Sequence, residues 1–241
     1  QGTGANVVIP NGGIKMLVTD GAGAGAAVTD VLDMTGGTGN VGLGSGALGT
    51  SITTGTDNVA IGDSAGDAIT TGTRNSLLGD NSGGAITTGT QNTFVGRDAG
   101  AANTTASSNT FIGERAGLTN TTGDLSVAVG QYSLALNTTG ANNVAIGRST
   151  LSANTTADNN TAVGYQSMNA NTTGANNVAL GALSLDANTT GDRNTALGKG
   201  ALGVNTTADN NTAVGASSLD ANTTGATNTA VGANSLSSNT T

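Results

Sequence analysis

Residues 160–176 read Asn-Thr-Ala-Val-Gly-Tyr-Gln-Ser-Met-Asn-Ala-Asn-Thr-Thr-Gly-Ala-Asn, and close variants of this 17-residue phrase fill most of the chain. We number each copy from its first Asn, so Asn160 is position 1 and Asn176 is position 17. After one step of 18 residues, the Gly at position 5 returns every 17 residues, at Gly44, Gly62, Gly79, Gly96, Gly113, Gly130, Gly147, Gly164, Gly181, Gly198, Gly215 and Gly232. Such regular self-similarity predicts a fold that stacks one short unit many times.

The first five positions of each copy have the pattern of a short strand rather than a helix. Positions 2 and 4 alternate with positions 1, 3 and 5, as in residues 143–147 (Asn-Val-Ala-Ile-Gly), and a period of two is the signature of a strand. Gly, Thr and Asn interrupt every copy and are unfavourable inside helices. We expect a strand at the start of each copy and a second extended segment over positions 8 to 14, with Gly at position 5 and Gly or Ala at position 15 forming corners.

Stacking these units predicts an all-β protein, a parallel β-solenoid or β-roll of 17-residue coils over residues 40–241. A strand too short to bury a core alone can bury one against the same strand of the next copy. Twelve coils about 4.8 Å apart would make a rod on the order of 55 Å long. We expect interior columns from the Leu at position 9 and from the aliphatic residue at position 4, which includes Ile146, Val163, Leu180 and Leu197.

Two columns of Asn are expected to form hydrogen-bonded ladders along the rod, because stacked amides can both donate and accept. The column at position 1 includes Asn58, Asn143, Asn160, Asn177, Asn194 and Asn211. The second column begins the Asn-Thr-Thr triplets that run from Asn103 to Asn239. Each triplet is also a formal N-glycosylation acceptor, but the spacing of 17 residues favours a ladder.

Side-chain volume is exchanged between two positions of the repeat. Leu77, Phe94 and Phe111 replace the usual Ala at position 3, and the same copies have Gly where later copies have Leu or Met at position 9. Ile52, Ile69 and Ile86 likewise precede the Asn series at position 12. We therefore expect a rod of two sections with different cross-sections, although simple drift among the copies would give the same pattern.

The narrow interior of a 17-residue coil favours association of several chains. The recurrent Ala at position 3 would present a smooth face to which another backbone could approach closely, so we expect three parallel copies to pack as a homotrimer. Residues 1–39 lie outside the repeat. Residues 13–19 and 26–34 have strand-like sequences joined by a Gly-rich turn at 21–25, which predicts a small β cap or connector. Because the chain starts without Met and stops inside a repeated phrase, we expect it to be part of a longer protein.

Composition excludes several classes of function. The chain has no Cys, His or Trp, which excludes disulfides, imidazole catalysis and the usual zinc sites. Its net charge is −8 and its basic residues are scattered, so nucleic acid is not an expected partner. No apolar run is long enough for a membrane helix, so membrane insertion is not expected.

The phrase in residues 160–176, and the Asn-Val-Ala-Ile-Gly core in residues 58–62, resemble known repeats. The first is similar to repeats of bacteriophage tail fibres and tailspikes, and the second resembles the head repeats of trimeric autotransporter adhesins, which form β-rolls of three chains. The period of 17 is longer than the usual adhesin repeat. The resemblance implies a trimeric architecture and gives function by analogy only.

Three other motifs have simpler structural explanations. Residues 44–49 match the Gly-x-Gly-x-x-Gly pattern of dinucleotide sites, but Gly44 is a repeat corner and no cofactor is expected. Arrays of Thr can bind ice, yet adjacent residues such as Thr172 and Thr173 point to opposite faces of a strand. The acidic residues do not recur at a fixed position, so we interpret them as solvated surface; they are Asp63, Asp67, Asp98, Glu114, Asp158, Asp186 and Asp209.

The sequence therefore predicts a non-enzymatic, homotrimeric shaft of a viral tail fibre. Its location would be the virion, and other parts of the fibre would contact a glycan or protein on the host surface. A bacterial cell-surface adhesin is the main alternative and an ice-binding solenoid a minor one. No catalytic, cofactor or metal residues are expected, because no paired carboxylates or calcium-loop spacings recur.

Overall fold

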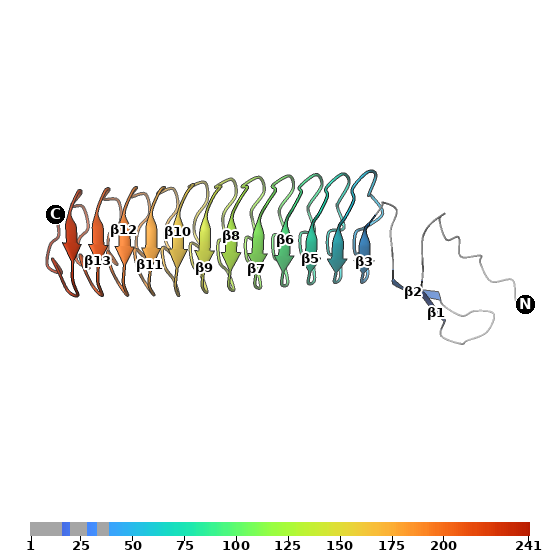
Figure 1. The fold of residues 1–241 in the computed structure, drawn as a ribbon, viewed down its shortest axis with the longest axis horizontal. Coiled ribbons are helices and arrows are strands. Elements are labelled where there is room, and N and C mark those ends of the chain that lie inside the picture. The colour runs from blue at the N-terminus through green and yellow to red at the C-terminus, as the bar shows by residue number, and fades with distance from the viewer. Residues whose placement is uncertain (1–15, 20–27, 33–38) are drawn as a thin grey trace, which may run out of the picture.

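A computed structural model describes residues 16–19, 28–32 and 39–241, and it shows a long parallel β-solenoid (Figure 1). Before the repeat, strands β1 (Met16–Thr19) and β2 (Val28–Leu32) pair antiparallel. Both strands lie within the two segments predicted to be strand-like. The Gly-rich turn expected at 21–25 lies outside the described residues. The role of residues 1–39 as a cap or connector stays a prediction.

Each copy of the repeat contributes one three-residue strand to a single twelve-stranded parallel sheet. Neighbours in the sheet are neighbours in sequence, and each strand residue pairs with the residue 17 positions later; only the first pairing, β3 with β4, is offset by 18. The strands are β3 (Val41–Leu43), β4 (Val59–Ile61), β5 (Ser76–Leu78), β6 (Thr93–Val95), β7 (Thr110–Ile112), β8 (Val127–Val129), β9 (Val144–Ile146), β10 (Thr161–Val163), β11 (Val178–Leu180), β12 (Thr195–Leu197), β13 (Thr212–Val214) and β14 (Thr229–Val231). The predicted fold class and the assignment of one copy to one coil are confirmed.

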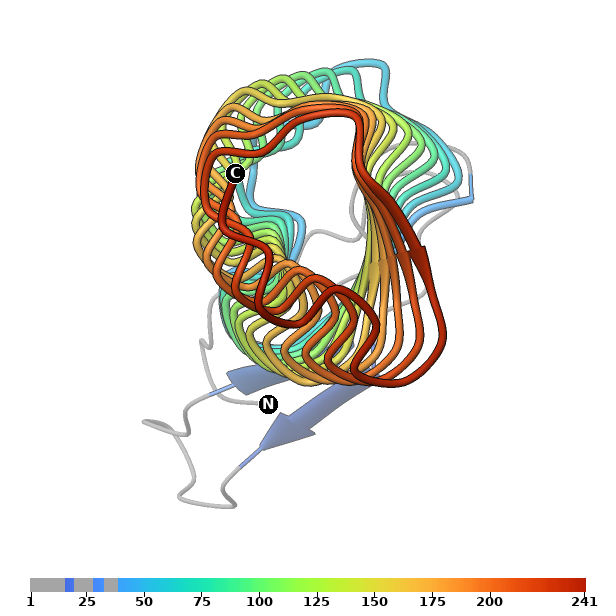
Figure 2. The same ribbon diagram turned by 90° about the vertical axis from the view of Figure 1, so that its left-hand side faces the viewer.

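The second extended segment, expected over positions 8 to 14, is wrong. Positions 6 to 11 form turns instead, and residues at positions 7, 9 and 17 have left-handed backbone conformations, as in Tyr132 (φ 59°), Leu134 (φ 52°) and Asn142 (φ 57°). These three reversals per coil close the chain without a second strand. Successive coils still bond here, for example from the Leu134 N–H to the Thr150 carbonyl at 2.9 Å. Figure 2 looks along the rod and shows each coil turned slightly relative to its neighbour.

The side chains that fill the interior are those of positions 1, 3, 8, 9 and 12. Leu at position 9 is fully buried, as expected, in copies such as those of Leu134 and Leu185. The expected interior column at position 4 lies on the outside instead, with Ile146 39% and Leu180 40% exposed, and Val163 and Leu197 half-buried. The strand alternation explains the difference, because position 3 points inward and so positions 2 and 4 must both point outward.

The Ala at position 3, which we expected to be an outer face, is therefore part of the core. Ala145, Ala162, Ala179 and Ala196 are all fully buried. An Ala fits here because the opposite wall of the narrow coil, with its Leu at position 9, lies close by.

The predicted exchange of volume between positions 3 and 9 is visible in the contacts. The Phe94 and Phe111 rings stack with centroids 4.9 Å apart and an interplanar angle of 5°. A Cβ atom added to Gly117 would lie 2.4 Å from the Phe111 ring, and one added to Gly100 would lie 2.4 Å from Phe94. A large side chain at position 3 therefore requires Gly at position 9. The rod does have two interior sections, with large residues at position 3 in the copies of Leu77, Phe94 and Phe111.

The corner Gly at position 5 is required by both conformation and space. Gly62, Gly147, Gly164, Gly181 and Gly198 all have φ between 133° and 140°, a region that residues with a Cβ rarely adopt. A Cβ on Gly164 would also lie 2.6 Å from the carbonyl carbon and oxygen of Gly181. Successive coils therefore meet backbone to backbone along this edge.

We predict that Gly164→Ala destabilises the rod by about 2–4 kcal/mol, because the added methyl group adopts a strained conformation and separates two coils. Gly174→Ala is the matched control: Gly174 is at position 15, where Ala106, Ala157 and Ala208 occur in other copies. We expect this control to cost less than about 1 kcal/mol. Urea unfolding followed by circular dichroism compares the two, and equal losses of stability would contradict this role for position 5.

Candidate functional site: buried amide ladders and an exposed apolar stripe

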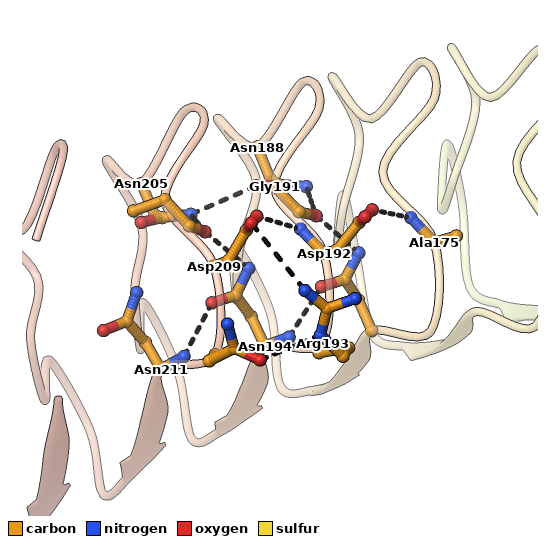
Figure 3. A network of polar contacts seen from close by, with 12 residues as sticks. Ala175, Asn188, Gly191, Asp192, Arg193, Asn194, Asn205, Asp209 and Asn211 are labelled. Atoms are coloured by element: carbon orange, nitrogen blue, oxygen red, sulfur yellow. Dashed lines mark hydrogen bonds and ion pairs between the residues drawn. The ribbon is translucent and has the colours of Figure 1, made fainter. Parts of the chain in front are cut away.

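The Asn side chains at position 1 form a ladder that joins each coil to the next. The Asn177 N–H donates to Asn160 Oδ1 at 2.9 Å, and the Asn194 N–H donates to Asn177 Oδ1 at 2.8 Å (Figure 3 shows the neighbouring rungs). Each amide nitrogen turns inward across its own coil, as Asn177 Nδ2 does to the Gly191 carbonyl at 2.8 Å. The oxygen therefore bonds between coils, and the nitrogen within a coil. Asn58, Asn143, Asn160, Asn177, Asn194 and Asn211 are fully buried.

The Asn side chains at position 12 form a second ladder, with a different bonding pattern. Asn188 Nδ2 donates to Asn171 Oδ1 at 2.8 Å, so here amide bonds directly to amide. The same nitrogen donates to the Gly191 carbonyl at 3.0 Å. Because Asn177 also donates to that carbonyl, both ladders converge on position 15 of each coil. Buried polar groups are stable when their hydrogen bonds are satisfied in this way.

Burial of the position 12 ladder also decides how the Asn-Thr-Thr triplets are read. The Asn side chains of the triplets from Asn103 to Asn222 are fully buried. An oligosaccharide cannot be accommodated on a buried amide in the folded chain. In the following residues, Thr172 Oγ1 donates to the Thr189 carbonyl at 2.9 Å while Thr173 is exposed. One Thr of each pair is thus used in the rod, and one faces outward.

Several acidic residues do recur at one position, which corrects the interpretation of them as unpatterned surface. Asp124, Asp158, Asp192 and Asp209 all occupy position 16. Each carboxylate accepts a hydrogen bond from the backbone of the preceding coil: the Ala175 N–H donates to Asp192 Oδ1 at 2.7 Å, and the Asp192 N–H donates to Asp209 Oδ1 at 2.8 Å (Figure 3). Aligning the copies at 17 residues, position by position, would have revealed this column.

The outward side chains of the strands form an uncharged stripe along the whole rod. Position 2 holds Val, Thr or Ser and position 4 holds Leu, Ile or Val in all twelve copies, without one charged residue. The charges lie instead at other positions, mainly 6, 7, 10, 16 and 17. Ile61, Leu78, Ile112, Ile146 and Leu180 are among the exposed residues of this stripe. We call these two columns the apolar stripe.

Few titratable groups in the described part of the chain are perturbed, and they do not converge on one point. Hydrogen bonds from Gln131 and then Arg97 lower the pKa of Glu114. Burial raises the pKa of Asp186. A hydrogen bond with Tyr132 is the main cause that raises the pKa of Arg115. Glu114 and Arg115 belong to a surface network, and Asp186 lies in a different coil.

Other features of the described residues bear on the remaining expectations. No three His, Cys, Asp or Glu side chains within the described ranges come together as a metal site would need. A search of the same residues finds no helix able to cross a membrane. Gly44, the first Gly of the dinucleotide-like motif, is a corner: a Cβ there would lie 2.4 Å from the Gly62 carbonyl oxygen.

Comparison with protein-family models, curated proteins and solved structures found no significant match. The chain is thus a parallel β-solenoid repeat protein, and its resemblance to fibre and adhesin repeats depends on the repeat motif alone.

The position 1 ladder gives a prediction with an adjacent control. Asn177→Asp removes the donor to Gly191 and buries a carboxylate, so we expect a loss of at least about 3 kcal/mol in the free energy of unfolding. Asn176→Asp makes the same change at position 17, which is exposed and left-handed and where Asp57 occurs naturally. We expect less than about 0.5 kcal/mol there. Urea unfolding measures both, and similar losses for the two variants would refute the ladder.

Proposed function

We propose that residues 40–241 are a structural element, a rigid shaft in a viral tail fibre that holds attachment parts away from the particle. The observation that carries this proposal is the unbroken register of the twelve-stranded sheet, in which every coil bonds to the next in the same way. Hydrogen bonds between coils occur at the strands, at the turns and at both ends of the turns. A rod joined on every side resists bending, as a spacer must.

The shaft would be a parallel homotrimer joined through the apolar stripe. The stripe is about 50 Å long and two side chains wide, on the order of 500 Å² per chain, a size that marks interaction surfaces on soluble proteins. Its residues repeat at the spacing of the strands, so a partner that fits along the whole length must have the same repeat. Another copy of this chain meets that condition. The assembly face is then the strand column, not the buried Ala column.

A charge placed in the stripe tests this assembly. We predict that the parent has three times the 22.9 kDa mass of one chain, and that Ile146→Lys with Leu180→Lys gives folded monomers. The control is Leu136→Lys with Val204→Lys, which places the same charges at exposed apolar residues of position 11, outside the stripe. We expect the control to remain trimeric in light scattering. A monomeric parent, or dissociation of both variants, would contradict the proposed interface.

The proposed location requires a separate measurement. Antibodies raised against residues 40–241 are expected to label fibres projecting from virus particles in electron micrographs. Labelling of bacterial cells in the absence of particles would instead establish the cell-surface adhesin, which needs the same rod. Labelling of neither would refute both locations, whatever the oligomeric state.

A further inference from the structure

The structure assigns a joint to the middle of the rod: in coils 92–108, 109–125 and 126–142 the interior ladders are interrupted, and we propose that two outer ladders of polar side chains hold these coils together instead. The inference concerns how the coils are joined and does not depend on the viral location.

The position 12 ladder is interrupted at the start of this segment. Ile86 ends the apolar part of the column, and Asn103 follows it. Both polar atoms of the Asn103 amide are buried without a hydrogen-bond partner. The first amide-to-amide bond of the ladder joins Asn137 Nδ2 to Asn120 Oδ1 at 2.7 Å. Between Ile86 and Asn120 this column therefore provides neither apolar stacking of like residues nor a polar rung.

The position 1 ladder is weakened in the same segment, because Ser126 replaces Asn. The hydroxyl accepts a hydrogen bond from the Asn143 N–H at 3.1 Å, so the rung between coils is kept. However, Ser126 has no amide group to donate across its coil. In the next coil Asn143 makes that bond, to the Ala157 carbonyl at 2.8 Å. Coil 126–142 thus lacks a cross-brace that its neighbours have.

The cross-section of the core changes in the same place. Phe111 at position 3 pairs in register with Ala128 of the next coil. Position 9 changes in the opposite sense, from Gly117 to Leu134. The aromatic stack of Phe94 and Phe111 ends at this step. Dissimilar interior layers therefore meet here, whereas identical layers meet along most of the later rod.

The two outer ladders span the interrupted coils. At position 6, Arg97 bonds to Glu114, Gln131 Nε2 donates to Glu114 Oε2 at 2.8 Å, and Arg148 Nε donates to Gln131 Oε1 at 3.2 Å. These contacts connect four successive coils through side chains alone.

At position 7 a parallel series connects another four coils. Asn81 Nδ2 donates to Asp98 Oδ1 at 2.9 Å, Arg115 Nε lies 3.5 Å from Asp98 Oδ2, and Arg115 Nη1 donates to Tyr132 Oη at 3.1 Å. Single exposed ion pairs contribute little to stability. Here, however, each central residue contacts partners in the coils on both sides, so the network acts on several junctions at once.

The test removes the centre of both ladders and compares a matched change in regular coils. Glu114→Ala with Arg115→Ser introduces residues that occur naturally at these positions, as in Ala182 and Ser149. The control, Tyr165→Ala with Gln166→Ser, makes the same replacements where both interior ladders are intact. Native-state hydrogen exchange is read at strand amides that bond to the next coil, Thr110 and Val127 in the joint and Thr161 and Val178 beside the control.

We expect the joint amides to exchange about tenfold faster in the first variant, equivalent to about 1.4 kcal/mol, and the control amides to change less than about twofold. Raising the salt concentration should produce the same selective loss in the parent, because exposed charges are screened. Equal changes at both sites, or no change at the joint, would overturn the proposal.

A repair variant tests the cause from the inside. Ser126→Asn restores the cross-brace to Gly140 and is expected to slow exchange of Val127. Combined with Glu114→Ala and Arg115→Ser, it should reduce their effect, because the outer and inner bonds act on the same coils. Independent, additive effects would show that the outer ladders do not compensate for the interrupted interior.

Discussion

The rest of the structure depends on the close backbone contact between one coil and the next at position 5. With Gly there, each carbonyl lies where a Cβ would otherwise be, and the coils approach closely enough for the hydrogen bonds between them to form. The interior is then too thin for large apolar side chains to fill it throughout. Amides fill much of the space instead, and a buried amide is stable only where its donors and acceptors are met. A strict repeat meets this requirement, because each Asn is offered the partners that the previous Asn was offered.

The backbone also adopts conformations that are unfavourable for single residues. Leu at position 9 is left-handed in copies such as those of Leu151 (φ 50°) and Leu185 (φ 52°), and such a conformation costs about 1–2 kcal/mol for a residue with a Cβ. The same residues are fully buried. Burial of a Leu side chain contributes about 1.5–3 kcal/mol, which offsets the strain. Where Phe occupies position 3, that burial is not available, and position 9 is Gly.

The sequence was sufficient to predict the solenoid, the length of its coil and the exchange of volume at positions 3 and 9, because each of these follows from comparing copies at a fixed period. It did not predict which face of the strand points inward. Ile146 and Leu180 are more hydrophobic than Ala145 and Ala179, so hydrophobicity alone placed position 4 inside. Space decided otherwise, since a coil closed by Leu at position 9 admits only a small residue opposite. The carboxylates at position 16 were missed because Ala and Ser alternate with Asp there, as in Ala175 and Asp192.

The apolar stripe and the joint are consistent with each other because the stripe crosses the joint without change. Thr110 and Ile112 pair with Val127 and Val129 in register, although the interior layers beneath them differ. The outer face of the sheet is therefore uniform where the core is not. If copies associate through the stripe, each chain supports its neighbour across the coils whose own interior bonds are incomplete. Association would then protect the joint from opening more than it protects the regular coils.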